Sequence, residues 1–265
     1  MKKILAVLLA AALCLSLLAA CGGNNTSSAG SAASGSSAAA LTTLNPGKLT
    51  ISTSPDFPPF EFTDDNGAII GIEPDIMKLV CDKLGLELQI DAMDFNSALL
   101  AAENGKSDAV VSGVTVKEDR KALFDFTDSY TEITQAIVSK KDAPITMDVL
   151  GQHQIGVQAG TTGQEFVEED FGTDHVTAYD TYSLVFQALE NGQVDCIVMD
   201  DAVAAKYIAD KPNLVVNKTT YQPEQYAFGF HKGNPDLVKA VNDALDQLKD
   251  DGTLLKIIDK WMSAD

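Results

Sequence analysis

Arg120 is the only arginine in the 265-residue sequence, in which lysine and arginine together number 19. A guanidinium is planar and can hold a carboxylate through two parallel hydrogen bonds, whereas a lysine ammonium acts as a point charge. The same side chain could instead form a surface ion pair with Glu118, Asp125 or Asp128, which would contribute at most about 1 kcal/mol. Arg120 is therefore a candidate for binding a carboxylate, with an ordinary ion pair as the alternative.

Two segments could present backbone N–H groups to the same anion. Thr115-Val116-Lys117-Glu118 fits a capping box, in which the threonine hydroxyl and the glutamate satisfy free N–H groups at a helix start. The segment at 158–163, Gln-Ala-Gly-Thr-Thr-Gly, follows an expected strand at 154–157 and precedes a helical stretch. It lacks the Gly-Lys-Ser/Thr ending of a phosphate loop. Helix amino ends carry a partial positive charge, so both segments favour an anionic group nearby.

Asp200 is a candidate for the opposite charge. It follows an apolar stretch that is expected to form a buried strand. At the end of such a strand its carboxylate could bind an ammonium group, or it could cap a helix that begins near Ala202.

Four phenylalanines lie where loops are expected. Phe57, Phe60 and Phe62 stand beside three prolines, and Phe95 stands at the start of a helical stretch. They could flank a bound molecule, although core packing is the ordinary use of such side chains.

The elements that must position these residues alternate between strand and helix. A helix is expected to open at Glu73-Pro74 and to end at Gly85, because apolar residues recur there at helical spacing. Strands are expected at 49–53, 86–90 and 109–111, and a further helix at 96–104. This βαβ order predicts an α/β fold with parallel sheet and helices on its faces.

A nine-residue pattern occurs twice in the chain. Glu-Asn-Gly-Lys-Ser-Asp-Ala-Val-Val at 103–111 recurs as Glu-Asn-Gly-Gln-Val-Asp-Cys-Ile-Val at 190–198. Each copy combines a helix end, a glycine cap, an aspartate and a short apolar strand. Chance similarity between two helix-to-strand junctions is the alternative. If the repeat is structural, it predicts two lobes of like architecture whose loops frame a cleft.

The N-terminus has the composition of an export signal. A short basic start at Lys2 and Lys3 precedes an apolar run to residue 20. Leu18-Ala19-Ala20-Cys21 resembles the bacterial lipobox, so Cys21 is the expected lipidation site, with an ordinary secretory signal as the alternative. Residues 21–47 then form the lipidated cysteine and a flexible Ser/Ala/Gly tether.

Charge and cysteine content exclude several classes of protein. The formal net charge of −19 argues against a nucleic-acid partner, because phosphate binding depends on basic side chains. Cys14 would leave with the signal, so Cys81 and Cys196 remain, and their expected places in different lobes predict two free, buried thiols.

The candidate residues stand in an order that resembles a known family. Ser54-Pro55-Asp56-Phe57-Pro58-Pro59-Phe60-Glu61-Phe62, Ser112-Gly113-Val114-Thr115 with Arg120, Gly160-Thr161-Thr162, and Asp200 resemble the extracellular solute-binding proteins, family 3, of polar amino-acid ABC transporters. The resemblance extends from residue 48 to the C-terminus. It implies a periplasmic-binding-protein-like type II fold, in which two α/β lobes joined by two hinge strands close on an L-amino acid.

The resemblance also implies a role for each candidate. The ligand's carboxylate would be held by Arg120, Thr115 and Thr162, its ammonium group by Asp200, Gly113 and Thr115, and its side chain by Phe57, Phe95, Ser54, Ser112 and Gln158. Physical chemistry independently favours this arrangement, because a buried zwitterion needs an opposite charge at each end. Ser54 stands where binders of cationic side chains commonly have an acidic residue. A neutral polar ligand side chain is therefore the preferred expectation, although Asp56, Glu61 or Asp201 could supply charge.

The expected organisation follows from the same resemblance. Lobe 1 would comprise 48–138 and 225–265 and lobe 2 would comprise 139–224, with hinges near 139–142 and 221–226. The expected partners are a free L-amino acid, an ABC transporter permease and the bilayer through a diacylglyceryl Cys21. The protein is expected to be a monomer, anchored outside the cytoplasm on the outer face of the cell membrane. No cofactor or metal is expected.

The alternative is a secreted enzyme on the same fold, such as a cyclohexadienyl or prephenate-type dehydratase relative. It would need a general acid or base in the cleft, and the three histidines, His153, His175 and His231, lie in no recognised catalytic motif. A non-enzymatic binding function is therefore preferred.

Overall fold

The computed structural model describes residues 41–263. The predicted signal peptide, Cys21 and most of the predicted tether lie outside the described residues, so these predictions stay untested. No helix in the described part of the chain is long and apolar enough to cross a membrane.

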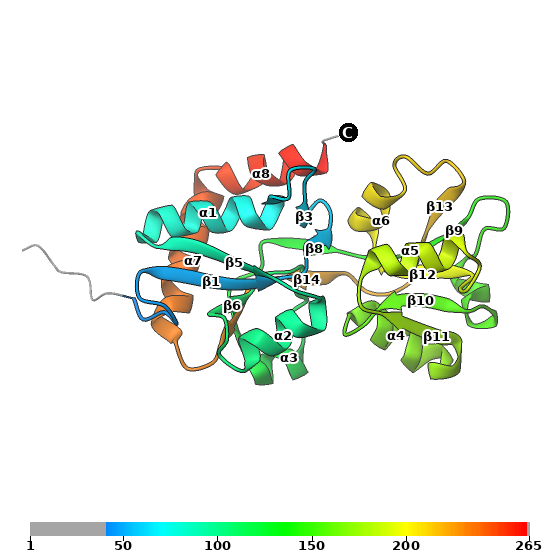
Figure 1. Ribbon diagram of the computed structural model, residues 1–265, viewed down its shortest axis with the longest axis horizontal. Helices are drawn as coiled ribbons and strands as arrows, with labels where there is room; N and C mark the ends of the chain where they lie inside the picture. Colours follow the sequence, from blue (N-terminus) through cyan, green and yellow to red (C-terminus); the bar gives the residue numbers. More distant parts are fainter. Residues whose placement is uncertain (1–40, 264–265) are drawn as a thin grey trace, which may run out of the picture. The chain divides into compact units, whose positions relative to one another are not determined.

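The first sheet has the strand order β5-β1-β6-β15-β7. Its strands are β1 (Lys48–Thr53), β5 (Glu87–Ala92), β6 (Ala109–Val110), β7 (Phe124–Phe126) and β15 (Gly229–His231). Strand β1 runs parallel to β5 and β6, and β15 is antiparallel to β6 and β7. Helices α1 (Ile72–Leu84), α7 (Pro235–Asp250) and α8 (Thr253–Met262) pack together, with α2 (Phe95–Glu103) on the other side of the sheet (Figure 1).

The second sheet has the strand order β11-β10-β12-β9-β13. Its strands are β9 (Gln135–Lys140), β10 (Ile155–Gln158), β11 (Val176–Tyr179), β12 (Cys196–Asp200) and β13 (Leu214–Lys218). Helix α4 (Thr162–Phe171) lies on one side, and α5 (Tyr182–Glu190) and α6 (Asp201–Tyr207) lie on the other (Figure 1). Two 3-10 helices, Met147–Gln152 and Thr173–His175, complete this lobe.

Two short strands carry the chain between the sheets. β8 (Thr131–Ile133) pairs antiparallel with β14 (Glu224–Tyr226), and β8 leads into β9 while β14 leads into β15. We call the residues at 41–130 and 227–263 the first lobe, and those at 134–223 the second lobe. A small sheet of β2 (Asp56–Phe57), β3 (Glu61–Thr63) and β4 (Ile69–Ile70) belongs to the first lobe.

The predicted boundary between residues 138 and 139 differs from this arrangement. It falls inside β9, which pairs along its whole length with β12 and β13. The predicted hinge at 139–142 therefore lies in the second lobe, whereas the one at 221–226 contains β14. The apolar pattern of 135–140 indicates a buried strand but does not indicate which sheet the strand joins.

The predicted tether also ends earlier than expected. Leu41 packs against the core, and the Leu44 backbone N–H donates to Asp108 Oδ1 at 2.6 Å. The Asn234 amide donates to the Thr42 carbonyl at 2.7 Å. Residues 41–47 are thus docked on the first lobe by partners far away in the sequence.

The internal repeat is confirmed by matching hydrogen bonds in the two lobes. In the first copy, Asp108 N donates to Thr50 O and Thr50 N donates to Asp108 Oδ2, both at 2.8 Å. In the second, Asp195 N donates to Gln154 O at 2.8 Å and Gln154 N donates to Asp195 Oδ2 at 2.9 Å. Each aspartate fixes its strand to the neighbouring strand, which explains why both copies contain it.

The two cysteines are free and buried, as predicted. Cys81 lies in α1 and Cys196 in β12. Burial raises the pKa of each thiol to about 12, so neither is a thiolate at neutral pH.

Candidate ligand-binding site

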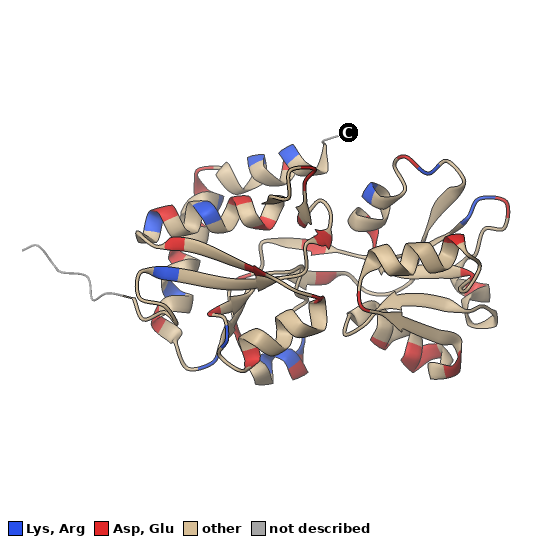
Figure 2. Ribbon diagram, viewed as in Figure 1, with Lys and Arg blue, Asp and Glu red and all other residues tan. Residues whose placement is uncertain are grey.

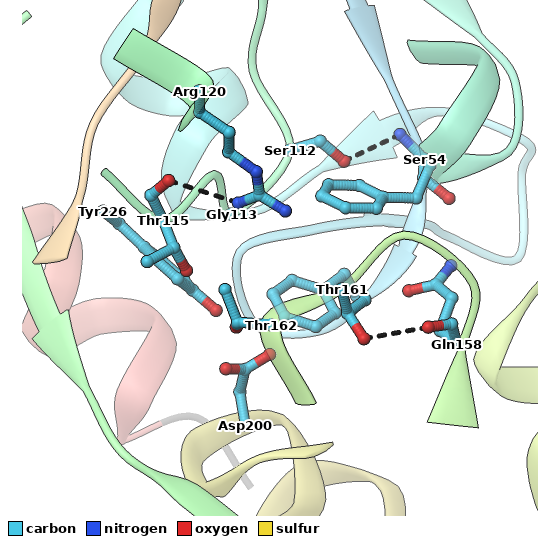
Figure 3. Close-up of a pocket in the computed structure, with 12 residues that line it drawn as sticks. Ser54, Ser112, Gly113, Thr115, Arg120, Gln158, Thr161, Thr162, Asp200 and Tyr226 are labelled. Carbon is cyan, nitrogen blue, oxygen red and sulfur yellow. Dashed lines mark hydrogen bonds between the residues drawn. The ribbon is translucent and has the colours of Figure 1, made fainter. Parts of the chain in front are cut away.

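All ten residues that the sequence singled out for ligand contact line one cavity, together with Thr161 and Tyr226 (Figure 3). They follow the carboxyl ends of strands in both sheets, where α/β folds place their ligands. The first lobe supplies Ser54, Phe57, Phe95, Ser112, Gly113, Thr115 and Arg120, the second supplies Gln158, Thr161, Thr162 and Asp200, and Tyr226 comes from β14.

Arg120 is buried at one side of the cavity, with 5% of its surface exposed. One of its terminal nitrogens donates to the Thr115 carbonyl at 3.2 Å, and the other donates to the second-lobe Gly160 carbonyl at 2.9 Å. Its guanidinium also lies 5.7 Å from the centre of the Phe95 ring. Burial lowers the pKa of Arg120, while Glu165 and other carboxylates oppose that shift. A guanidinium has five donors, so donors remain for a carboxylate in the cavity.

The alternative role of Arg120 in a surface ion pair is not observed. In the described part of the chain no ion pair joins it to Glu118, Asp125 or Asp128. Its buried position, away from bulk water, suits a ligand contact instead.

The predicted capping box at Thr115 is wrong. Helix α3 (Glu118–Leu123) begins after Lys117 and has no side-chain cap, because the Thr115 backbone forms a β-bridge with Tyr226. Arg120 still lies in the first turn of this short helix. Thr115 therefore reaches the cavity from an extended segment, whereas α4 does place its amino end there through Thr161 and Thr162.

Asp200 lies across the cavity from Arg120 (Figure 3) and is 5% exposed. Its Oδ1 atom accepts a hydrogen bond from the Gln135 amide at 2.7 Å. Burial raises the pKa of Asp200 to about 8, and the nearby Glu224 carboxylate adds to this rise. Asp200 is the residue before α6, but its side chain does not cap that helix. The Ala202 N–H donates to the Asp201 side chain instead. The Asp200 side chain also forms a hydrogen bond with that of Tyr226, and it lines the cavity, where its ionised form can meet a cation.

Of the four phenylalanines considered for ligand contact, two line the cavity and two pack against other parts of the protein. Phe57 and Phe95 line the cavity, while Phe60 is fully buried in the core. Phe62 packs edge-to-face against Trp261, with ring centres 5.6 Å apart.

Gly113 is required where it stands. Its φ of +55° is unfavourable for other residues, and an added Cβ would lie 2.5 Å from Cε1 of Phe57. The glycine therefore lets the Phe57 ring close over the backbone at the cavity wall.

A group of residues around Asp200 was not foreseen from the sequence. The Gln135 amide donates both to Asp200 and, at 2.8 Å, to Glu224. Glu224 also accepts from the Thr162 hydroxyl at 3.1 Å. A glutamine at the start of an apolar strand was the available signal, but its partners lie 65 and 89 positions away.

Comparison with known proteins places this site in a family. The model of the bacterial extracellular solute-binding proteins, family 3, matches residues 49–264. A probable histidine-binding protein of Neisseria gonorrhoeae is 32% identical over 83% of this chain and 85% of its own length. ABC transporter arginine-binding protein 1 of Escherichia coli is 30% identical over 81% of this chain and 90% of its own. A solved structure of an ancestral arginine-binding protein bound to arginine has a TM-score of 0.77 and 37% identity, covering 81% of this chain and 98% of that one.

The chain belongs to the bacterial extracellular solute-binding proteins, family 3. Its two lobes with mixed sheets form the periplasmic-binding-protein type II fold. Membership of this family identifies a binding protein rather than an enzyme.

Proposed function

We propose that this protein captures a free L-amino acid between its two lobes and delivers it to an ABC importer. The observation that carries the proposal is the position of Arg120 and Asp200 on opposite sides of one cavity, in different lobes. They are the only charged side chains among the described residues that line it. This separation of charge matches a zwitterion and leaves the space between for an uncharged side chain.

The ends of the ligand would be held by groups from both lobes. Arg120, with the backbone N–H groups of Thr115 and Thr162, would bind the carboxylate. Asp200, the Gly113 carbonyl and the Thr115 hydroxyl would bind the ammonium group. Because each end contacts both lobes, ligand binding favours the closed arrangement.

The surroundings of Ser54 favour a neutral polar side chain that donates a hydrogen bond. Ser54 lines the cavity and its hydroxyl donates to Asp56 Oδ1 at 3.0 Å, so the hydroxyl oxygen can act toward a ligand only as an acceptor. Asp56 does not line the cavity, and its two oxygens accept from the Ser54 hydroxyl and the Tyr182 N–H. With Phe57 and Phe95 flanking and Ser112 and Gln158 nearby, this environment suits an amide or a neutral imidazole.

We also propose that lipid on Cys21 anchors the protein to the outer face of the cell membrane. The tether then lets a monomer reach its permease. Acidic positions are distributed over both lobes (Figure 2), and such a surface gains nothing from anionic lipid headgroups, so the acyl chains would supply the attachment. Labelling of the cells with a fatty-acid analogue, with Cys21→Ser as control, tests this anchor.

A thermal-shift screen against the twenty amino acids and cystine tests the function. We expect stabilisation by an amino acid with a neutral, N–H-bearing side chain, and calorimetry then gives the affinity. Stabilisation by none of them would refute amino-acid capture. Stabilisation by lysine or glutamate but not by glutamine or histidine would refute the proposed selectivity.

A further inference from the structure

Two glutamates lie buried side by side in the first lobe, behind the cavity wall. Glu61 in β3 is 1% exposed, and Glu73 in the first turn of α1 is fully buried. Neither belongs to the residues that line the cavity. Carboxyl groups are almost never buried without a specific arrangement of partners.

The first oxygen of each carboxyl group holds the segment that forms the cavity wall. Glu61 Oε1 accepts from the Ser112 hydroxyl at 2.9 Å, and the Ser112 oxygen accepts from Ser54 N at 3.0 Å. Glu73 Oε1 accepts from the Gly113 N–H at 3.0 Å and from the Tyr130 hydroxyl at 2.5 Å. The pair therefore fixes both Ser112 and Gly113.

The second oxygen of each carboxyl group is left without a partner. Among the described residues, Glu61 Oε2 and Glu73 Oε2 are buried and have no hydrogen-bond partner. The two carboxyl groups bind the adjacent residues Ser112 and Gly113, and a hydrogen bond between the two groups requires a proton on one of them, because two carboxylates have no donor between them. The other partners, a serine hydroxyl, a tyrosine hydroxyl and a backbone amide, are uncharged and cannot neutralise two negative charges.

We propose that Glu61 and Glu73 hold one proton between them, and that this proton-bridged pair positions Gly113 for the ammonium end of the ligand and Ser112 for its side chain. Glu61 donates the shared proton to Glu73, and the remaining negative charge stays on Glu73 beneath Gly113. The positioning role rests on the proposed amino-acid binding, whereas the shared proton does not. Both residues are positioning residues, since neither reaches the cavity.

The surroundings agree with this assignment of the proton. Burial raises the pKa of both groups, and Glu73 adds to the rise at Glu61. The other titratable groups that act on the pair are Asp56 on β2 and Tyr130 before β8. The Asp56 carboxyl group disfavours a second charge on the pair.

The variant Glu61→Gln tests the proposal without removing the hydrogen bonds. Its amide N–H replaces the shared proton toward Glu73, and its carbonyl replaces Glu61 Oε1 toward Ser112. We expect its affinity for the amino acid to stay within about twofold of wild type at neutral pH. The thermal midpoint of the variant relative to wild type should rise with pH, because only wild type loses a bridging proton.

Infrared difference spectra read the proton directly. The wild type minus Glu61→Gln spectrum at neutral pH should contain the carbonyl stretch of a protonated carboxylic acid. The matched control Glu87→Gln, at an exposed lysine-paired glutamate, should remove only ionised carboxylate bands. Loss of only carboxylate bands in Glu61→Gln, or a tenfold weaker affinity in a folded variant, would overturn the proposal. If wild type binds no amino acid, the proposed function fails, while the infrared result still decides the shared proton.

Discussion

The Asp56 carboxylate accepts a hydrogen bond from the Tyr182 backbone N–H at 2.7 Å, although 126 positions separate the two residues. Asp56 belongs to the first lobe and Tyr182 is the first residue of α5 in the second. The Tyr207 hydroxyl adds a bond to the Asp56 backbone carbonyl at 2.7 Å. A carboxylate at a helix amino end is favourable, so a group of one lobe caps a helix of the other. This contact exists only when the lobes are together.

We therefore expect Asp56→Ala to weaken ligand binding through faster dissociation. A hydrogen bond to a charged group contributes about 1.5–3 kcal/mol, which corresponds to roughly 10- to 100-fold in affinity. In an open state water would solvate both groups, so the loss falls on the closed state. Stopped-flow dissociation rates measure the effect, with Asp65→Ala on an exposed loop nearby as the control. An unchanged dissociation rate would show that this contact does not hold the lobes together.

The sequence was informative wherever the relevant contacts are local or follow a strand end. The helix from Glu73-Pro74 to Gly85 could be predicted because its apolar spacing and its glycine cap are encoded within one segment. The cavity residues could be grouped because polar side chains after parallel strands meet at one edge of a sheet. The repeat could be recognised because the same aspartate fixes each copy.

What the sequence could not provide depends on distant partners. Thr115 has the residues of a capping box around it, but a bridge to Tyr226 overrides that local preference. Glutamate is usually exposed, and only the folded chain shows that Glu61 and Glu73 are both buried. Similarly, nothing near Gln135 indicates that it holds two carboxylates from other strands.

Arg120→Lys is expected to weaken amino-acid binding by about 1.5–3 kcal/mol, roughly 10- to 100-fold. The lysine keeps the charge but loses the planar pair of donors and the carbonyl contacts to Thr115 and Gly160. Isothermal titration calorimetry gives the change. Lys121→Ala, one residue along and half-exposed, serves as the control and should bind as wild type does. Equal affinities for wild type and Arg120→Lys would refute the carboxylate clamp.

Ligand affinity should rise with pH until Asp200 is ionised. Burial raises the pKa of Asp200 to about 8 in the absence of ligand, and an ammonium group requires the charged form. Binding then releases a proton below pH 8, so affinity should increase by up to about tenfold per pH unit from pH 6 to 8. Because the folded-state pKa exceeds the unfolded value of 3.8, this carboxyl group lowers the stability of the ligand-free protein progressively as pH rises from about 4 to 8.

Calorimetry in buffers of different ionisation enthalpy counts the released proton directly. Asp200→Asn should bind weakly and should lose this part of the pH dependence. A wild-type affinity that is flat between pH 6 and 8, with no proton release, would show that Asp200 does not meet the ammonium group.

Gly160→Ala should oppose closure while leaving each lobe folded. A Cβ at Gly160 would lie 2.2 Å from Oδ1 of Asn96, which belongs to α2 of the first lobe. The φ of +80° at Gly160 adds backbone strain, but the open and closed states share that strain. Overpacking in a core costs about 1–3 kcal/mol, but Oδ1 is the end of an exposed side chain that can turn away, so we expect the loss in binding to be roughly fivefold or less. The double variant Asn96→Ala/Gly160→Ala removes the obstructing side chain and should recover most of the affinity. The single variant Asn96→Ala should bind as wild type does, because Asn96 is exposed. Equal binding by the single and double glycine variants would mean that backbone strain, and not contact between the lobes, makes Gly160 necessary.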